Sequence, residues 1–173
     1  MNEGVIDLQL KYPDVVGWLA ITGAQIDCPI AWRANYTPGF ASNVDPGLVG
    51  KLIMDYRCER DFTSRNTVLY DHTKSGGMFD ALKAFVDKDF FDKNPCGTIF
   101  LPRDNLTLEF FAYMVVKSTE KNIYSTGLDL EYVKQHARQY RDVELAGGDR
   151  FVTLSTCAYE FDGARMVLLA RII

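Results

Sequence analysis

The sequence of 173 residues predicts a mainly β protein with short helices, an α+β fold in one domain, residues 1–173. About eight short segments are rich in β-branched and aromatic residues, whereas only two or three have apolar residues at helical spacing. Most strand-like segments follow another strand directly, which favours antiparallel pairing. A closed or nearly closed barrel would leave no strand edge exposed.

Strand-like segments and turn signals alternate along the chain. The predicted strands are residues 18–21, 25–32, 52–56, 67–70, 98–101, 106–117, 151–157 and 166–173. The first two surround Thr22-Gly23-Ala24, which is a turn signal. Residues 33–50 contain two prolines and three glycines, so we expect a long loop there.

Three segments have the apolar spacing of a helix. Residues 3–11 predict a short N-terminal helix that ends before Pro13. Gly76-Gly77 opens a second helical pattern over residues 78–85. A third helix is predicted over residues 129–140, where apolar residues recur every three or four positions.

The composition excludes several classes of protein. Hydrophobic residues make up 47% of the chain and charged residues 24%, which is typical of a globular protein and not of a disordered one. The formal net charge of −4 argues against a nucleic-acid partner. We find no apolar run of about 18 residues that could span a membrane, and no signal peptide. These features fit a cytoplasmic protein or the soluble part of a longer one.

The chain has four cysteines, Cys28, Cys58, Cys96 and Cys157. None forms a CxxC pair, and no Cys/His cluster has zinc-finger spacing. Disulfide pairing stays open, although a domain of this length does not need cross-links to fold.

The chain has only two histidines, the residues that most often transfer protons near neutral pH. His72 follows a predicted strand and precedes a loop, so it is placed for a cleft, although a loop histidine without a task has the same pattern. His136 lies within the predicted helix 129–140 beside charged residues, which favours a solvated position.

Cys157 ends a predicted strand, where a thiol can be held rigidly and still be exposed. Asp162-Gly163 is a hairpin signal, and Arg165 follows it at the start of the last strand. Two strands joined in this way lie about 5 Å apart, so Arg165 can project near the thiol. Arginine is a permanent cation with several donors and can stabilise an oxyanion. A core cysteine and a surface arginine are the alternative interpretations.

Taken together, residues 153–157 (TLSTC) and 162–167 (DGARMV) resemble the active-site signature of the sortases. The likeness to class B sortases extends through residues 158–161, and residues 66–72 and 76–79 resemble the family's histidine segment and the helix that follows it. Further matches in the family's order are residues 13–19, 26–30 and 53–57. The resemblance therefore covers nearly the whole chain.

The resemblance implies an eight-stranded sortase β-barrel with an N-terminal helix and a helix between strands six and seven. It also implies a cysteine transpeptidase in which Cys157 is the nucleophile, His72 transfers protons and Arg165 stabilises the reacting carbonyl. Thr156 and Ser155 are the candidate substrate-binding residues. The implied partners are the sorting-signal peptide of a secreted protein and an amine from a peptidoglycan precursor or a pilin lysine. No cofactor is needed.

Family members sit at the extracellular face of the membrane on an N-terminal anchor, so we expect this sequence to be the extracellular catalytic part. Two features depart from the family pattern. Asp71 stands where sortases usually have glycine, and residues 31–50 match poorly. A hydrolytic cysteine peptidase and a sortase-like binding domain without turnover are the competing interpretations. The caspase and papain signatures are absent.

Overall fold

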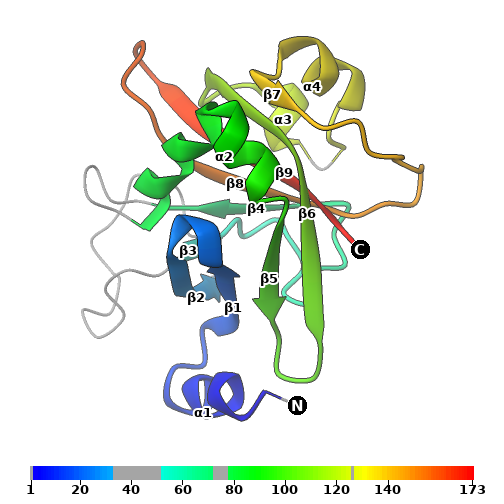
Figure 1. Ribbon diagram of the computed structural model, residues 1–173. Helices are drawn as coiled ribbons and strands as arrows, with labels where there is room; N and C mark the ends of the chain where they lie inside the picture. Colours follow the sequence, from blue (N-terminus) through cyan, green and yellow to red (C-terminus); the bar gives the residue numbers. More distant parts are fainter. Residues whose placement is uncertain (1, 33–51, 72–77, 126) are drawn as a thin grey trace.

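The computed structural model describes residues 2–32, 52–71, 78–125 and 127–173 (Figure 1). Within these residues it shows a closed barrel of eight strands with short helices, as predicted. The barrel strands are β1 (Val15–Ile21), β2 (Ile26–Trp32), β3 (Leu52–Met54), β4 (Asn66–Tyr70), β5 (Cys96–Phe100), β6 (Asn105–Lys117), β8 (Phe151–Cys157) and β9 (Ala164–Ile172).

The strand order around the barrel is β5-β1-β2-β3-β4-β8-β9-β6, and pairing of β6 with β5 closes it. Most pairs are antiparallel, as predicted, but β2–β3 and β4–β8 are parallel. The short strand β7 (Gln139–Tyr140) adds to the outer edge of β6. Closure leaves no long edge strand free among the described strands.

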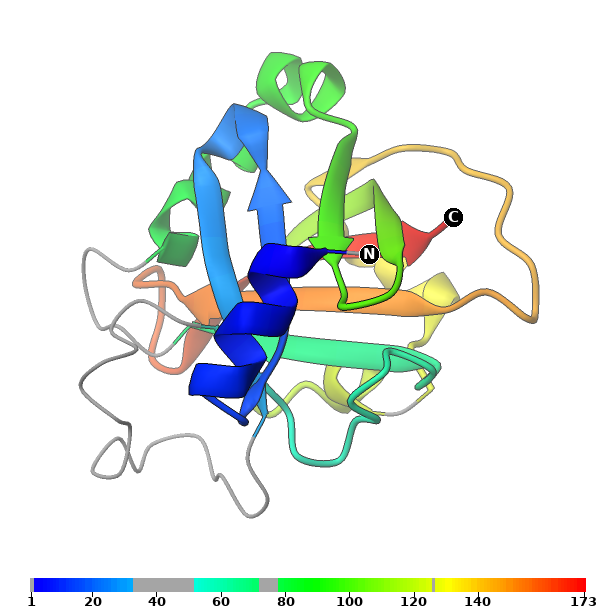
Figure 2. The ribbon, with the colours of Figure 1, turned by 90° about the horizontal axis from the view of Figure 1, so that it is seen from below.

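The helices surround the barrel. They are α1 (Glu3–Lys11), α2 (Lys88–Lys93), α3 (Lys121–Tyr124), α4 (Leu130–His136) and the 3₁₀ helices η1 (Thr22–Ala24) and η4 (Met78–Val86). Figure 1 shows α3, α4 and β7 grouped together, on the opposite side of the molecule from α1. In Figure 2, α1 lies in front of the barrel, with β4 and β8 side by side behind it. No described helix is long and apolar enough to cross a membrane.

Two apolar cores hold this arrangement together. The larger core fills the barrel and includes Leu154 and Leu168, and η4 adds Phe79, Leu82 and Phe85 to it. The second core lies between the outer face of β6, β8 and β9 and the helices α3 and α4, and includes Phe151, Ile123 and Val133. Because successive residues of a strand point to opposite faces, β8 serves both cores at once.

The structure shortens some predicted elements. The strand predicted over residues 52–56 ends at Met54, because Asp55 accepts the backbone amides of Arg57 and Cys58 in a turn. The helix predicted over residues 129–140 ends at His136, since Arg138 donates its amide to Tyr113 O and the chain enters β7. The loop predicted over residues 33–50 and the Gly76-Gly77 helix start lie outside the described residues.

Candidate active site

The β8–β9 hairpin places Cys157 directly opposite Arg165. Side chains of directly opposed residues share a face, with Cβ atoms about 4.5–5.5 Å apart. The predicted turn is present: Ala164 donates its amide to Phe161 O at 3.1 Å, and Gly163 has a φ of +72°, which suits glycine. Both functional side chains are half-buried. The hairpin therefore brings the predicted thiol and guanidinium together.

A hollow of about 110 Å³ adjoins this pair. It is lined by Tyr70, Asp71, Ser118, Tyr124, Ser155, Thr156, Cys157 and Arg165. These residues come from the ends of β4, β8 and β9 and from the connection that contains α3. In this structure Nη1 of Arg165 donates to Ala164 O at 2.9 Å. We call this hollow the Cys157 hollow.

Two stacked tyrosines form one wall of the Cys157 hollow. The rings of Tyr70 and Tyr124 have centroids 6.2 Å apart and planes inclined by 27°. The hydroxyl of Tyr124 lies 2.8 Å from Ser155 Oγ. Burial raises the pKa of Tyr124 to about 12, although the bond to Ser155 and the charge of Arg165 act in the opposite direction. Tyr124 is therefore a neutral hydrogen-bonding group at physiological pH.

Asp55 forms a hydrogen bond with the other tyrosine of this wall, Tyr70. Tyr70 donates its hydroxyl to Asp55 Oδ2 at 3.2 Å, and Arg57 Nη2 lies 2.7 Å from the same oxygen. Burial alone would raise the pKa of Asp55, but the bonds and charge of Arg57 and the Tyr70 hydroxyl outweigh it and lower the pKa. Burial and the charge of Asp55 raise the pKa of Tyr70, so this phenol also stays neutral.

Asp71 is buried, and its Oδ2 accepts the backbone amide of Phe79 at 2.7 Å. Its own amide donates to Ser155 O at 3.1 Å. The carboxylate thus joins the end of β4 to the start of η4. His72 is the next residue in the sequence, but it lies outside the described residues.

The structure also places the two candidate substrate-binding residues. Ser155 and Thr156 are both buried. Ser155 contacts Tyr124, whereas Thr156 Oγ1 has no hydrogen-bond partner among the residues that the structure describes. Both line the Cys157 hollow, and their direct contact with a peptide stays a prediction.

The other cysteines do not line this hollow, and all four thiols are free. Burial, with the charges of Asp71 and Asp27, raises the pKa of Cys28 to about 12, so it is an inert core thiol. Cys58 is also buried, and Cys96 is exposed at the start of β5. His136 is exposed on α4, as the sequence predicts, and its ring stacks on Tyr132.

Comparison with known proteins identifies the family. The chain is 32% identical to Sortase B of Listeria monocytogenes over 187 aligned residues, which cover 100% of this chain and 75% of that protein. The chain belongs to the class B sortases. It is therefore a cysteine transpeptidase of the sortase type. Sortase B of Staphylococcus aureus is 28% identical over 92% of this chain and 70% of its own length. No family model matches the sequence.

Solved sortase structures share the fold. The sortase B from the type II pilus of Streptococcus pneumoniae has a TM-score of 0.82 and 30% identity, covering 96% of both chains. A Streptococcus pyogenes class B sortase involved in pilus biogenesis has a TM-score of 0.86 and 27% identity, covering 99% of this chain and 100% of the other. A sortase B solved in complex with triglycine has a TM-score of 0.81 and 27% identity, covering 97% of this chain and 84% of the other.

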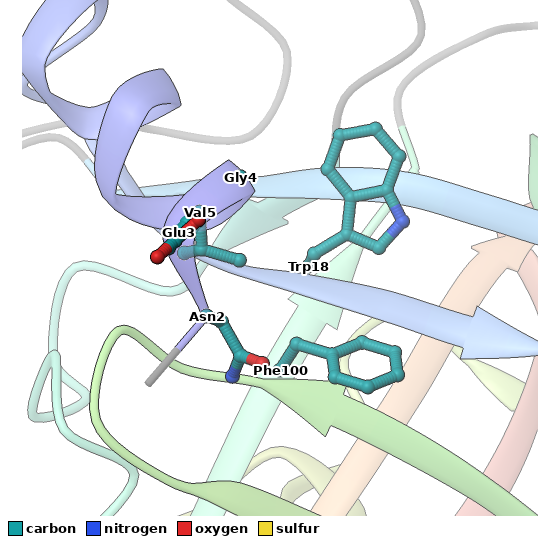
Figure 3. A pocket seen from close by; sticks show the side chains of 6 residues that line it. All are labelled: Asn2, Glu3, Gly4, Val5, Trp18 and Phe100. Atoms are coloured by element: carbon teal, nitrogen blue, oxygen red, sulfur yellow. The ribbon is translucent and has the colours of Figure 1, made fainter.

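Larger hollows occur elsewhere on this sortase. One of about 490 Å³ lies beside α1, where Asn2, Trp18 and Phe100 surround it (Figure 3). It shares no lining residue with the Cys157 hollow, so the candidate active site is not the largest hollow among the described residues. Among the described residues, no cluster of three or more His, Cys, Asp or Glu side chains is arranged to hold a metal ion.

Sequence reasoning missed Tyr70 and Tyr124 as wall residues. Tyr124 lies in α3, a four-residue helix with too few positions to show a helical period. The one available signal was Glu120, whose side chain accepts the amide of Asn122 and caps this helix.

Proposed function

We propose that this sortase cleaves a C-terminal sorting signal through a thioester on Cys157 and transfers the product to an amine, as one catalytic domain over residues 1–173. The Cys157 thiolate attacks a backbone carbonyl of the signal, and the carbon–nitrogen bond breaks as His72 protonates the leaving amine. An incoming amine then attacks the thioester. The carbon–sulfur bond breaks, and His72 accepts the proton of the new nucleophile.

The observation that carries this proposal is the pairing of Cys157 with Arg165 across β8 and β9 at the edge of a hollow. A fixed cation beside the attacking sulfur suits the charge that develops on the carbonyl oxygen. The buried hydroxyl of Thr156, which lacks a partner among the described residues, and the neighbouring Ser155 are proposed to contact the peptide.

The role of His72 rests on sequence. His72 follows Asp71, and Asp71 lines the Cys157 hollow. The only other histidine, His136, stacks on Tyr132 and bonds to its carbonyl in α4, and it does not line this hollow. His72 is therefore the histidine that we assign to proton transfer.

The similar proteins support the two partners. Staphylococcus aureus sortase B, 24% identical, has been solved with its substrate, and another sortase B with triglycine. We propose a sorting-signal peptide as donor, and an amine of a peptidoglycan precursor or a pilin lysine as acceptor. Two of the structural neighbours belong to pilus systems, which keeps the pilin acceptor in the proposal. Sortases are cell-surface enzymes, and attachment through an N-terminal membrane anchor is part of the same proposal.

The test separates transfer from hydrolysis. A pentapeptide library is incubated with the protein, with and without triglycine, and products are identified by mass spectrometry. We expect cleaved peptides that carry triglycine in its presence, and no product from Cys157→Ala, which should stay folded. Cleaved peptides that carry only a free carboxylate, and never triglycine, would indicate a hydrolytic peptidase. Full transfer by Cys157→Ala would overturn the assignment.

A further inference from the structure

Asn66, at the first position of β4, has a buried side-chain amide whose nitrogen and oxygen both form hydrogen bonds. It is 1% exposed. Its Nδ2 donates to Ile123 O at 2.9 Å and to Ser125 O at 3.1 Å, and its Oδ1 accepts Thr153 Oγ1 at 2.7 Å. Buried polar groups stabilise one geometry only when they are satisfied, and losing a partner is costly. This amide therefore ties β4 and β8 to a segment nearly 60 residues later in the chain.

The two carbonyl groups that Asn66 holds flank Tyr124 on either side. Tyr124 lines the Cys157 hollow, stacks on Tyr70 and bonds to Ser155. Helix α3 has four residues, and a helix this short has no stability of its own in water. The position of the Tyr124 ring therefore depends on contacts from outside the helix: Ile123 packs in the second core, and Asn66 supplies two hydrogen bonds.

Arg57 makes a second, weaker contact with the backbone of Tyr124. Arg57 Nη2 lies 3.4 Å from Tyr124 O, but its side chain is 49% exposed and already paired with Asp55. Exposed contacts of this kind contribute little. Asn66 is the buried hydrogen-bond donor of the two, and it bonds to the backbone both before and after the tyrosine.

We propose that Asn66 is a positioning residue for the peptide: it holds residues 123–125 against the barrel so that Tyr124 forms the wall of the Cys157 hollow. The peptide part rests on the proposed function. Because Asn66 does not line the hollow, it acts through Tyr124 and leaves the reactivity of Cys157 unchanged. Its loss should weaken peptide binding and spare the chemical step.

The test compares Asn66→Ala with Asn94→Ala as a matched control. Asn94 also donates its side-chain amide to a backbone carbonyl, Phe90 O at 2.8 Å, but it lies at the end of α2 and lines a different hollow. Hydrogen exchange is followed by mass spectrometry for residues 120–125 and for β8. Kinetics use the pentapeptide of the library that wild type cleaves best, with triglycine as the amine. Alkylation of Cys157 by iodoacetamide is measured on its proteolytic peptide.

For Asn66→Ala we expect exchange in residues 120–125 to accelerate about tenfold or more, and by more than exchange in β8, where Thr153 loses its acceptor. The KM for the peptide should rise about tenfold, while kcat and the alkylation rate stay within about threefold. Asn94→Ala should leave all of these values near wild type. Thr153→Val removes the hydroxyl that donates to Asn66 and should change the exchange of residues 120–125 and the KM in the same direction. It replaces Asn66→Ala in the test if that variant does not fold.

Three results would overturn the proposal: unchanged exchange in residues 120–125, an equal acceleration in β8, or a loss of kcat with KM unchanged. Failure of the proposed function has a different signature, because wild type would then cleave no library peptide. In that case hydrogen exchange, which needs no substrate, still decides whether Asn66 holds the tyrosine wall.

Discussion

At the residue scale, the proposed role of Arg165 needs both its charge and its planar shape. Lysine at this position would keep the charge but lose the planar set of donors. We therefore expect Arg165→Lys to lower kcat/KM for the best library peptide about a hundredfold, the size of effect seen when one oxyanion donor is removed.

The matched control for this change is Arg171→Lys on the same strand. Arg171 pairs with Glu109, with Nη2 2.6 Å from Oε2, and does not line the Cys157 hollow. It should retain near-normal turnover. Equal rates for Arg165→Lys and wild type would remove Arg165 from the mechanism.

The Asp55–Arg57 pair makes a prediction about pH. The pKa of Asp55 is lowered in the folded state, so its contribution to stability is present above the ordinary value of 3.8 and is lost as pH falls through the lower folded value. Arg57→Ala removes the main groups that lower this pKa. The difference in the free energy of unfolding between wild type and Arg57→Ala should thus be largest near neutral pH and shrink below 3.8.

Urea unfolding at a series of pH values measures this difference. Asp55→Asn supplies the control, because a side chain that does not titrate should make the effect of Arg57→Ala independent of pH. A difference that stays constant for the wild-type pair down to strongly acidic pH would contradict the assignment of the shift to this ion pair.

At the element scale, the structure explains the aspartate that stands where sortases usually have glycine. Asp71 accepts the amide of Phe79, whose side chain is buried in the barrel core. The residue therefore fastens the start of η4 to the end of β4, on either side of the segment that contains His72.

We expect Asp71→Ala to lower the free energy of unfolding by about 1–3 kcal/mol, because the buried amide of Phe79 loses its acceptor. Asp71→Asn keeps an oxygen that can accept this bond and should cost less. Urea unfolding midpoints of the two variants measure the effect. Wild-type stability in Asp71→Ala would show that the bond to Phe79 contributes nothing.

The β8–β9 hairpin shows why part of the site could be predicted at this scale. Cys157, the Asp162-Gly163 turn and Arg165 are close in sequence, so turn chemistry and strand period together decide their pairing. The 3₁₀ character of η4 and the short α2 and α3 were not predicted, because their few residues contain little periodic information.

At the scale of the whole molecule, the eight barrel strands could be predicted and their order could not. Apolar alternation identifies a strand but does not name its partner. The parallel pair β4–β8 joins segments more than 80 residues apart, as the bond from Thr153 to Asn66 illustrates. The Tyr124 wall depends on this long-range pairing, so local sequence patterns could not reveal it.

The resemblance to sortases supplied what local patterns lacked. It correctly implied the closed barrel, the N-terminal helix α1 and a helix between the sixth and seventh barrel strands, which is α4. The pairing of Cys157 with Arg165 agrees with the roles that the resemblance implies. The role of His72 stays a prediction, because residues 72–77 lie outside the described part of the chain.

The most direct test asks whether an acyl group becomes attached to the sulfur of Cys157. The protein is mixed with its best library peptide without an added amine, quenched in acid, and its intact mass is measured. We predict a mass increase equal to the amino-terminal part of the cleaved peptide, located on Cys157 and removed by hydroxylamine. Peptide cleavage that never passes through an adduct on this cysteine, or an adduct on another residue, would contradict the mechanism.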